Sequence, residues 1–143
     1  MSFNVLIVDD SNTMRMVIRK IIGMSGFKMD KCFTAGNGKE ALEILVNEWV
    51  DVIISDINMP EMNGLDLLAR LKKDDLYKEI PVIMISTEGS DERIRETFDC
   101  GAQGFIKKPF LPEELRKILY EIIGVGNDGE YAKDEAAAVD LDF

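Results

Sequence analysis

Short aliphatic segments alternate along the chain with segments whose apolar residues recur at helical spacing. Three of the aliphatic segments are compact and bounded by polar or turn residues, as strands buried on both faces should be: residues 3–8, 52–55 and 82–86. Two weaker candidates, 28–34 and 104–106, stand where further strands are due. The pattern therefore predicts five strands.

Helices are expected between these strands. Apolar residues follow the i, i+3, i+4, i+7 rule at Met14, Val17, Ile18, Ile21 and Ile22, and so do Leu115, Ile118, Leu119 and Ile122. Residues 41–45, 65–71 and 94–98 supply three more helical segments. Five strand–helix repeats with short connections imply right-handed crossovers, and hence a doubly wound α/β domain whose parallel sheet is covered on both faces. Such domains bind ligands beyond the carboxyl ends of their strands.

Composition and charge exclude several functional classes. A chain of 143 residues has room for one domain and a short appendage, and its formal net charge of -10 argues against a nucleic-acid partner. The longest aliphatic stretches, VLIV, VIIS and VIMIS, are far shorter than the roughly 20 residues that span a bilayer. With no basic, signal-like start, we expect a cytoplasmic protein with no membrane partner. Cys32 and Cys100 lack metal-type spacing, which indicates idle thiols.

Polar side chains that could bind a ligand or take part in a reaction follow four of the expected strands. They are Asp9 and Asp10, then Asp56, then Ser86 and Thr87, and finally Lys107 and Lys108. Each has a purely structural alternative. Asp9 and Asp10 could form a polar strand end with a helix cap, Asp56 could be a turn residue, Ser86 could cap a helix, and Lys108 could be a solvated surface lysine. Their joint placement at one sheet edge favours a site. Three carboxylates in a chain without histidine favour a hard cation with oxygen ligands, Mg²⁺ before Zn²⁺ or Ca²⁺.

Four ordered motifs resemble the receiver domain of bacterial response regulators, and most of all its single-domain chemotaxis regulators. The motifs are VDDSNTMR, SDINMPEMNGLDLL, PVIMISTEG and GFIKKPF, and the resemblance covers residues 3 to about 124. It implies a flavodoxin-like strand order of 2-1-3-4-5. It also implies a signalling switch rather than an enzyme, which accepts a phosphoryl group from a sensor histidine kinase. A downstream target such as the flagellar motor switch, and a phosphatase, are the further partners that it implies.

The resemblance assigns a role to each matching site residue. Asp56 is the implied nucleophile and phosphorylation site. Asp10 would bind Mg²⁺ directly and Asp9 mainly through a water, with Asp56 and the backbone carbonyl of Asn58 as the other protein ligands. A dication would offset the repulsion between the adjacent Asp9 and Asp10. Lys108 would contact a phosphoryl oxygen.

Further positions of the resemblance concern switching and lifetime. The Ser86 hydroxyl would meet the phosphoryl group, and Phe105, which stands where the chemotaxis protein has tyrosine, would move inward by packing alone. Asn58 and Glu88 match the positions that tune the lifetime of the acyl phosphate. A cis peptide bond between Lys108 and Pro109 is expected as well.

The last part of the chain has no place in the receiver pattern. We expect a receiver domain at 1–124 and an acidic tail at 125–143; residues 126–143 hold six acidic residues and one lysine. One alternative is a solvated tail. The other is a segment ending in Val139, Leu141 and Phe143 that packs on the domain or on a partner. One such hypothesis is a helix at 130–143 over the surface formed by the segments at 94–98, 104–106 and 115–122.

Four alternative functions can be compared with the receiver assignment. A phosphorelay intermediate would use the same site and pass its phosphoryl group to a histidine phosphotransfer protein, and no residue excludes it. A degenerate receiver that only binds partners would lack part of the acid set, which this chain keeps. An aspartyl-phosphate phosphatase needs an acid at position 58, where Asn58 stands. Nucleotide binding lacks its glycine fingerprint after the first strand.

Overall fold

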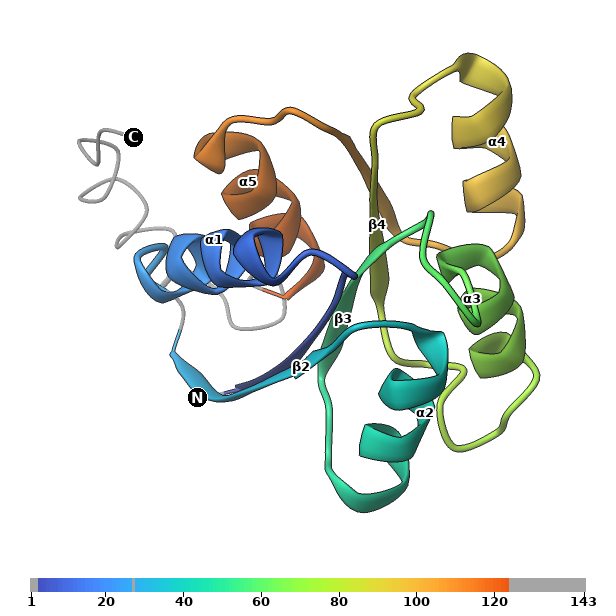
Figure 1. The fold of residues 1–143 in the computed structure, drawn as a ribbon. Helices are drawn as coiled ribbons and strands as arrows, with labels where there is room; N and C mark the ends of the chain where they lie inside the picture. The colour runs from blue at the N-terminus through green and yellow to red at the C-terminus, as the bar shows by residue number, and fades with distance from the viewer. Residues whose placement is uncertain (1–2, 27, 124–143) are drawn as a thin grey trace.

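The computed structural model describes residues 3–26 and 28–123, in which strands and helices alternate along the chain (Figure 1). The strands are β1 (Phe3–Val8), β2 (Met29–Ala35), β3 (Val52–Asp56), β4 (Val82–Ser86) and β5 (Gly104–Lys107). The helices are α1 (Asn12–Gly23), α2 (Gly38–Asn47), α3 (Gly64–Lys72), α4 (Asp91–Asp99) and α5 (Pro112–Ile122). The predicted α/β fold is confirmed. The expected domain boundary at 124, the acidic tail and its helix lie outside the described residues.

The strands form one parallel sheet in the order β2-β1-β3-β4-β5, as the resemblance implied. The chain runs outward from β1 to β2 and then returns to the other side of β1 to form β3. The connections that leave β1 and β3 therefore diverge, and a crevice opens at the carboxyl ends of these two strands. This is the sheet edge at which the sequence predicts the site.

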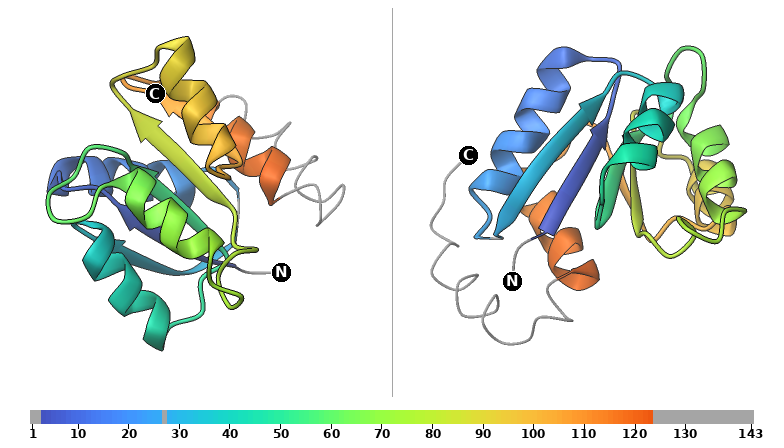
Figure 2. Two further views of the ribbon diagram at one scale, coloured as in Figure 1. Left: turned by 90° about the vertical axis from the view of Figure 1, so that its right-hand side faces the viewer. Right: turned by 90° about the horizontal axis from the view of Figure 1, so that it is seen from below.

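Two layers of helices cover the sheet (Figures 1 and 2). Successive residues of a strand face opposite sides, so Val5 and Ile7 of β1 join a core with α1 and α5, whereas Leu6 and Val8 join a second core with α2 and α3. All four of these side chains are fully buried. Burial on both faces explains why the strands are continuous aliphatic runs rather than alternating ones.

Helix starts are set by side-chain caps. Ser11, Asn37, Asn63 and Ser90 each accept a hydrogen bond from a backbone N–H in the first turn of α1, α2, α3 and α4. Ser11 caps α1 directly after the aspartate pair, which agrees with the alternative of a polar strand end followed by a helix cap. The capping alternative is wrong for Ser86, because Ser90 caps α4. In the described ranges, no helix has the length and apolar character needed to cross a membrane.

Candidate functional site

Three carboxylates meet at the carboxyl edge of the sheet. Asp9 and Asp10 follow β1, Asp56 ends β3, and one oxygen of each lies within 4.8 Å of the others. Asp9 and Asp56 are buried while Asp10 is exposed, so the cluster is open to solvent on one side. Clustered carboxylate oxygens suit a hard cation such as Mg²⁺, which keeps several of its waters. The donor set thus fits the metal predicted from the sequence.

Asp9 is oriented by the start of α1. Its Oδ1 accepts a hydrogen bond of 2.8 Å from the backbone N–H of Ser11. Its backbone carbonyl accepts a second from the guanidinium of Arg15, one turn into the helix. The sequence analysis missed this role of Arg15, although the residue closes the VDDSNTMR motif. Both contacts leave Oδ2 of Asp9 available to the site.

Lys108 is an internal cation rather than a solvated surface lysine. Its Nζ lies 3.1 Å from Oδ2 of Asp9 and 3.5 Å from Oδ2 of Asp56, and 14% of its side chain is exposed. Its backbone N–H donates to the carbonyl of Ser86 at 2.8 Å, which ties the turn after β5 to the end of β4. The bond from Lys108 to Pro109 is cis, as expected. The neighbouring Lys107 is exposed.

The surroundings of Asp56 disfavour the ionised form of its carboxyl. Burial raises the pKa of its carboxyl above the ordinary aspartate value, and the Asp9 carboxylate raises this pKa further. The Lys108 ammonium and the backbone N–H of Ile57, which donates to Oδ1 at 2.8 Å, act in the opposite direction. An additional cation at this site would favour ionised Asp56.

The end of β4 supplies a buried hydroxyl. Ser86 is fully buried, and its Oγ accepts a hydrogen bond of 3.0 Å from the backbone N–H of Glu88. The Glu88 carboxylate pairs with the guanidinium of Arg93 on α4 at 2.8 Å. The structure therefore joins Glu88 to α4 rather than to the acidic cluster. Arg93 is a second residue that the sequence analysis missed.

Two other residues predicted from the sequence lie outside the acidic cluster. Asn58 follows β3 in the loop to α3, and its side chain is exposed. Phe105 of β5 is partly buried against the core on the α2 and α3 side of the sheet. Their assigned roles in metal binding, lifetime and switching stay predictions.

Gly64 at the start of α3 determines how closely this helix approaches Asp56. A Cβ on Gly64 would lie 2.2 Å from the backbone oxygen of Asp56 and 2.6 Å from the Cε of Met84. The backbone N–H of Gly64 donates to the carbonyl of Ile57 at 2.7 Å. No other residue type fits this contact. The sequence shows Gly64 in the MNGLDLL motif, but only the structure shows that it allows α3 to approach Asp56 closely.

Comparison with known proteins defines the class. The response regulator receiver domain family matches residues 5–120, and the chain belongs to this family. A chemotaxis protein CheY homolog of Campylobacter jejuni is 39% identical over 130 residues, which are 90% of this chain and 98% of that protein. The family resemblance inferred from the four motifs is confirmed, as is the CheY-like character of the domain.

Solved structures agree with this assignment. The chemotaxis response regulator CheY4 of Vibrio cholerae is 36% identical, with a TM-score of 0.77 over 86% of this chain and all of that one. A CheX–CheY–BeF3–Mg complex from Borrelia burgdorferi gives a TM-score of 0.76 at 33% identity, over 84% of this chain and 88% of that one. The chain is thus similar to chemotaxis regulators over nearly their whole length.

Proposed function

We propose that this protein is a phosphorylation-activated response regulator that accepts a phosphoryl group on Asp56 from the phosphohistidine of a sensor histidine kinase. The observation that carries the proposal is the junction of Asp9, Asp10 and Asp56 with the Lys108 ammonium at the crevice of a receiver fold. Phosphoryl transfer depends mainly on positioning and charge stabilisation, and these four side chains supply both.

The chemistry of the transfer is simple. An ionised oxygen of Asp56 attacks phosphorus, a P–O bond forms, and the P–N bond to the donor imidazole breaks with its electron pair returning to nitrogen. Lys108 moves from its contact with Asp56 to an oxygen of the incoming phosphoryl group, because its Nζ already lies 3.5 Å from Oδ2 of Asp56. The Ser86 hydroxyl, buried at the end of the adjacent strand, contacts another phosphoryl oxygen.

Mg²⁺ is the proposed cofactor. Asp10 and Asp56 would bind it directly, Asp9 would act through a water, and the backbone carbonyl of Asn58 would complete the protein ligands. When bound, the metal neutralises negative charge on the carboxylates and on the phosphoryl oxygens. Burial is the main cause of the raised pKa of Asp56, and a bound cation would offset it by stabilising the ionised carboxylate.

Switching follows from the same contacts. Ser86 is drawn toward the phosphoryl group, which alters the turn that its Oγ makes with the N–H of Glu88. Glu88 is tied to Arg93, so this shift is transmitted to the start of α4. Phe105 on the neighbouring strand β5 then repacks without the hydrogen bond that a tyrosine would make. Asn58 and Glu88 adjust the access of water to the acyl phosphate and thereby its lifetime.

The output that the relatives support best is chemotaxis signalling. Residues 1–124 form the receiver, and its activated surface binds a downstream target such as the flagellar motor switch. A phosphatase that removes the phosphoryl group is a further expected partner, as the family resemblance implies. The CheY of Borrelia burgdorferi likewise binds a second protein, CheX. The protein is a switch that assists its own phosphorylation and dephosphorylation rather than a general enzyme.

Labelling with a small phosphodonor tests the central claim. After incubation with acetyl phosphate and Mg²⁺, intact-mass analysis should show one added phosphoryl group that hydroxylamine removes. Asp56→Asn should gain none. Asp66→Asn, which removes an exposed carboxylate on α3, serves as the matched control and should label as the wild type does. Labelling that survives in Asp56→Asn but disappears in Asp9→Asn would place the nucleophile in the aspartate pair and overturn the assignment.

A further inference from the structure

Helix α1 is a basic element in an acidic protein. It contains three basic residues and no acidic one, whereas the whole chain has a formal net charge of -10. Its outer side also exposes large apolar residues, with Met16 64% and Val17 42% exposed. An exposed surface that is both apolar and basic is complementary to a binding segment that is apolar and acidic.

A hollow of about 450 Å³ lies at the carboxyl end of α1, next to the start of the edge strand β2. We call it the α1 hollow; it is lined by Met16, Arg19, Lys20, Gly23, Met24 and Met29. Within residues 3–26 and 28–123, neither Arg19 nor Lys20 forms an ion pair. The thioether side chains supply an adaptable apolar floor, and the two cations are available at the rim.

The chain itself contains a segment of the complementary chemistry. Residues 139–143 read VDLDF, in which three apolar side chains alternate with two carboxylates. The twenty residues from 124 to 143 follow α5, and α5 packs in the same core as α1. Extended chain spans about 3.3 Å per residue, whereas α1 is only about 18 Å long at 1.5 Å per residue. The segment can therefore reach any part of α1.

We propose that the C-terminal segment 139–143 binds the α1 hollow of its own chain. Leu141 and Phe143 contact the methionine floor, and Asp140 and Asp142 pair with Arg19 and Lys20. Attachment to α5 gives the segment an effective concentration in the millimolar range, so contacts too weak for a separate peptide suffice. A partner that uses the exposed side of α1 must then displace this segment.

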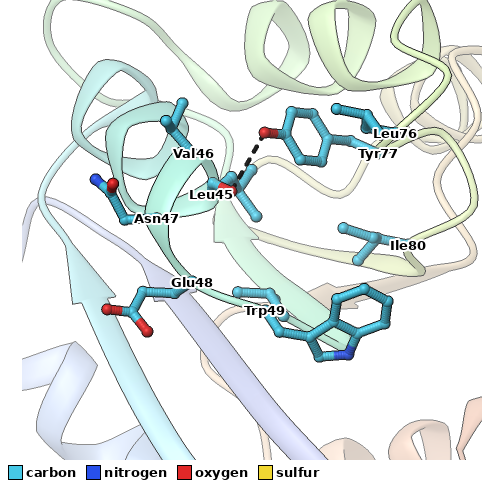
Figure 3. Close-up of a pocket in the computed structure, with 9 residues that line it drawn as sticks. Leu45, Val46, Asn47, Glu48, Trp49, Leu76, Tyr77 and Ile80 are labelled. Atoms are coloured by element: carbon cyan, nitrogen blue, oxygen red, sulfur yellow. Dashed lines mark hydrogen bonds between the residues drawn. The ribbon is translucent and has the colours of Figure 1, made fainter.

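Charge favours this site over two other surfaces of the described residues. A second hollow of about 340 Å³ lies near Trp49 and is bounded by Leu45, Val46, Leu76, Tyr77 and Ile80. Figure 3 draws these residues. The rim of this second hollow carries the Glu48 carboxylate, and the Trp49 indole N–H donates to Asp51 at 2.8 Å. An acidic segment would be repelled there. The same holds at α4, which has four acidic and two basic residues.

Methionine methyl signals provide the test. The full chain labelled at methionine ¹³Cε is compared with full-length Leu141→Ser/Phe143→Ser, whose substitutions lie outside the five-stranded domain. We expect the signals of Met16, Met24 and Met29 to move toward those of an uncovered surface, while Met59 and Met62 near α3 stay unchanged as internal controls. Unchanged signals at all three methionines of the α1 hollow would overturn the proposal.

Charge reversal tests the pairing independently. Asp140→Lys/Asp142→Lys and Arg19→Glu/Lys20→Glu should each release the segment at low salt, and their combination should restore the wild-type signals. Failure of the combination to restore them would contradict the ion pairs. Signals that depend on protein concentration would assign the segment to a second copy, and a shift at the Trp49 indole would assign it to the other hollow; either result overturns the proposal as stated.

Discussion

The ammonium group of Lys108 lies 3.1 Å from Oδ2 of Asp9, although 99 residues separate the two in sequence. Their strands, β5 and β1, are not neighbours in the sheet. The contact exists because both residues follow strands that end at the same edge. It places one largely buried positive charge within 3.5 Å of both Asp9 and Asp56.

Replacing Lys108 with methionine should destabilise the protein at neutral pH. The substitution keeps most of the apolar stem but leaves two buried carboxylates without their cation, which costs about 2 kcal/mol. The loss should shrink as the pH falls, because protonation of the carboxyls removes the repulsion. Urea unfolding at several pH values measures this, with Lys107→Met as the exposed control. An equal loss in both variants would refute a specific role for Lys108.

Asp56→Asn should stabilise the protein in the absence of divalent metal. The folded-state pKa of Asp56 is raised, so the folded protein holds its proton to higher pH than the unfolded chain does. This contribution to stability is present below the ordinary aspartate pKa and is lost as the pH rises through the folded pKa. At pH 7 the charged side chain opposes folding, and its removal should gain about 1 kcal/mol.

The gain from Asp56→Asn should disappear at a pH below the ordinary aspartate pKa. There the wild-type side chain is protonated in both states and resembles the amide. Thermal unfolding in EDTA across the acid range follows both proteins. A variant less stable than the wild type at pH 7 would contradict the direction of the pKa shift.

Magnesium should stabilise the wild type through the acidic cluster. With a Kd of about 1 mM, a concentration of about 10 mM would add about 1.4 kcal/mol to the free energy of unfolding. Asp10→Asn should lose most of this increment, because Asp10 is the exposed carboxylate of the three and the one assigned to direct ligation. Asp99→Asn, at the end of α4, should retain it. An unaltered increment in Asp10→Asn would reject the ligand assignment.

Gly64→Ala should be strongly destabilising. The added methyl group would lie 2.2 Å from the backbone oxygen of Asp56, so α3 would have to move away from β3, at a cost of about 3 kcal/mol. Gly23→Ala provides the contrast, because a Cβ there meets no atom within 4 Å. Chemical denaturation should show a stability close to the wild type for Gly23→Ala. Similar losses in both variants would point to helix position rather than to the contact with Asp56.

Trp49 should report poorly on the site. It precedes β3 while Asp56 ends this strand, so at least the length of the five-residue strand separates them, which is roughly 15 Å at about 3.3 Å per residue. The Trp49 side chain, which is labelled in Figure 3, is 77% exposed. Its indole N–H donates a hydrogen bond to Asp51. Tryptophan emission should therefore change little when Mg²⁺ binds or Asp56 is phosphorylated, even where mass analysis shows full labelling. A large emission change would indicate coupling across the whole sheet.

Local patterns in the sequence determined the elements and most of the site. A strand buried on both faces must be a short aliphatic run, and β1, β3 and β4 are recognisable for this reason. Because parallel strands end at one edge, their order along the chain was enough to group Asp9, Asp10, Asp56 and Lys108, and the four motifs identified the family. Element ends were less accurate: β3 extends to Asp56 and β5 to Lys107, one residue beyond each prediction. Both added residues pair with the neighbouring strand β4, Asp56 with Ile85 and Lys107 with Ser86.

Only the tertiary structure decided which groups touch. The pairing of Glu88 with Arg93, the support of Asp9 by Arg15 and the close approach of Gly64 to Asp56 depend on how helices pack on a twisted sheet. The spacing of apolar residues in the sequence predicts which face of a helix is buried. It does not predict the distance between that helix and the strand or helix on which it packs. For the same reason, the sequence shows that Met16, Met24 and Met29 are apolar, whereas their assembly with Arg19 and Lys20 around one hollow is a property of the fold.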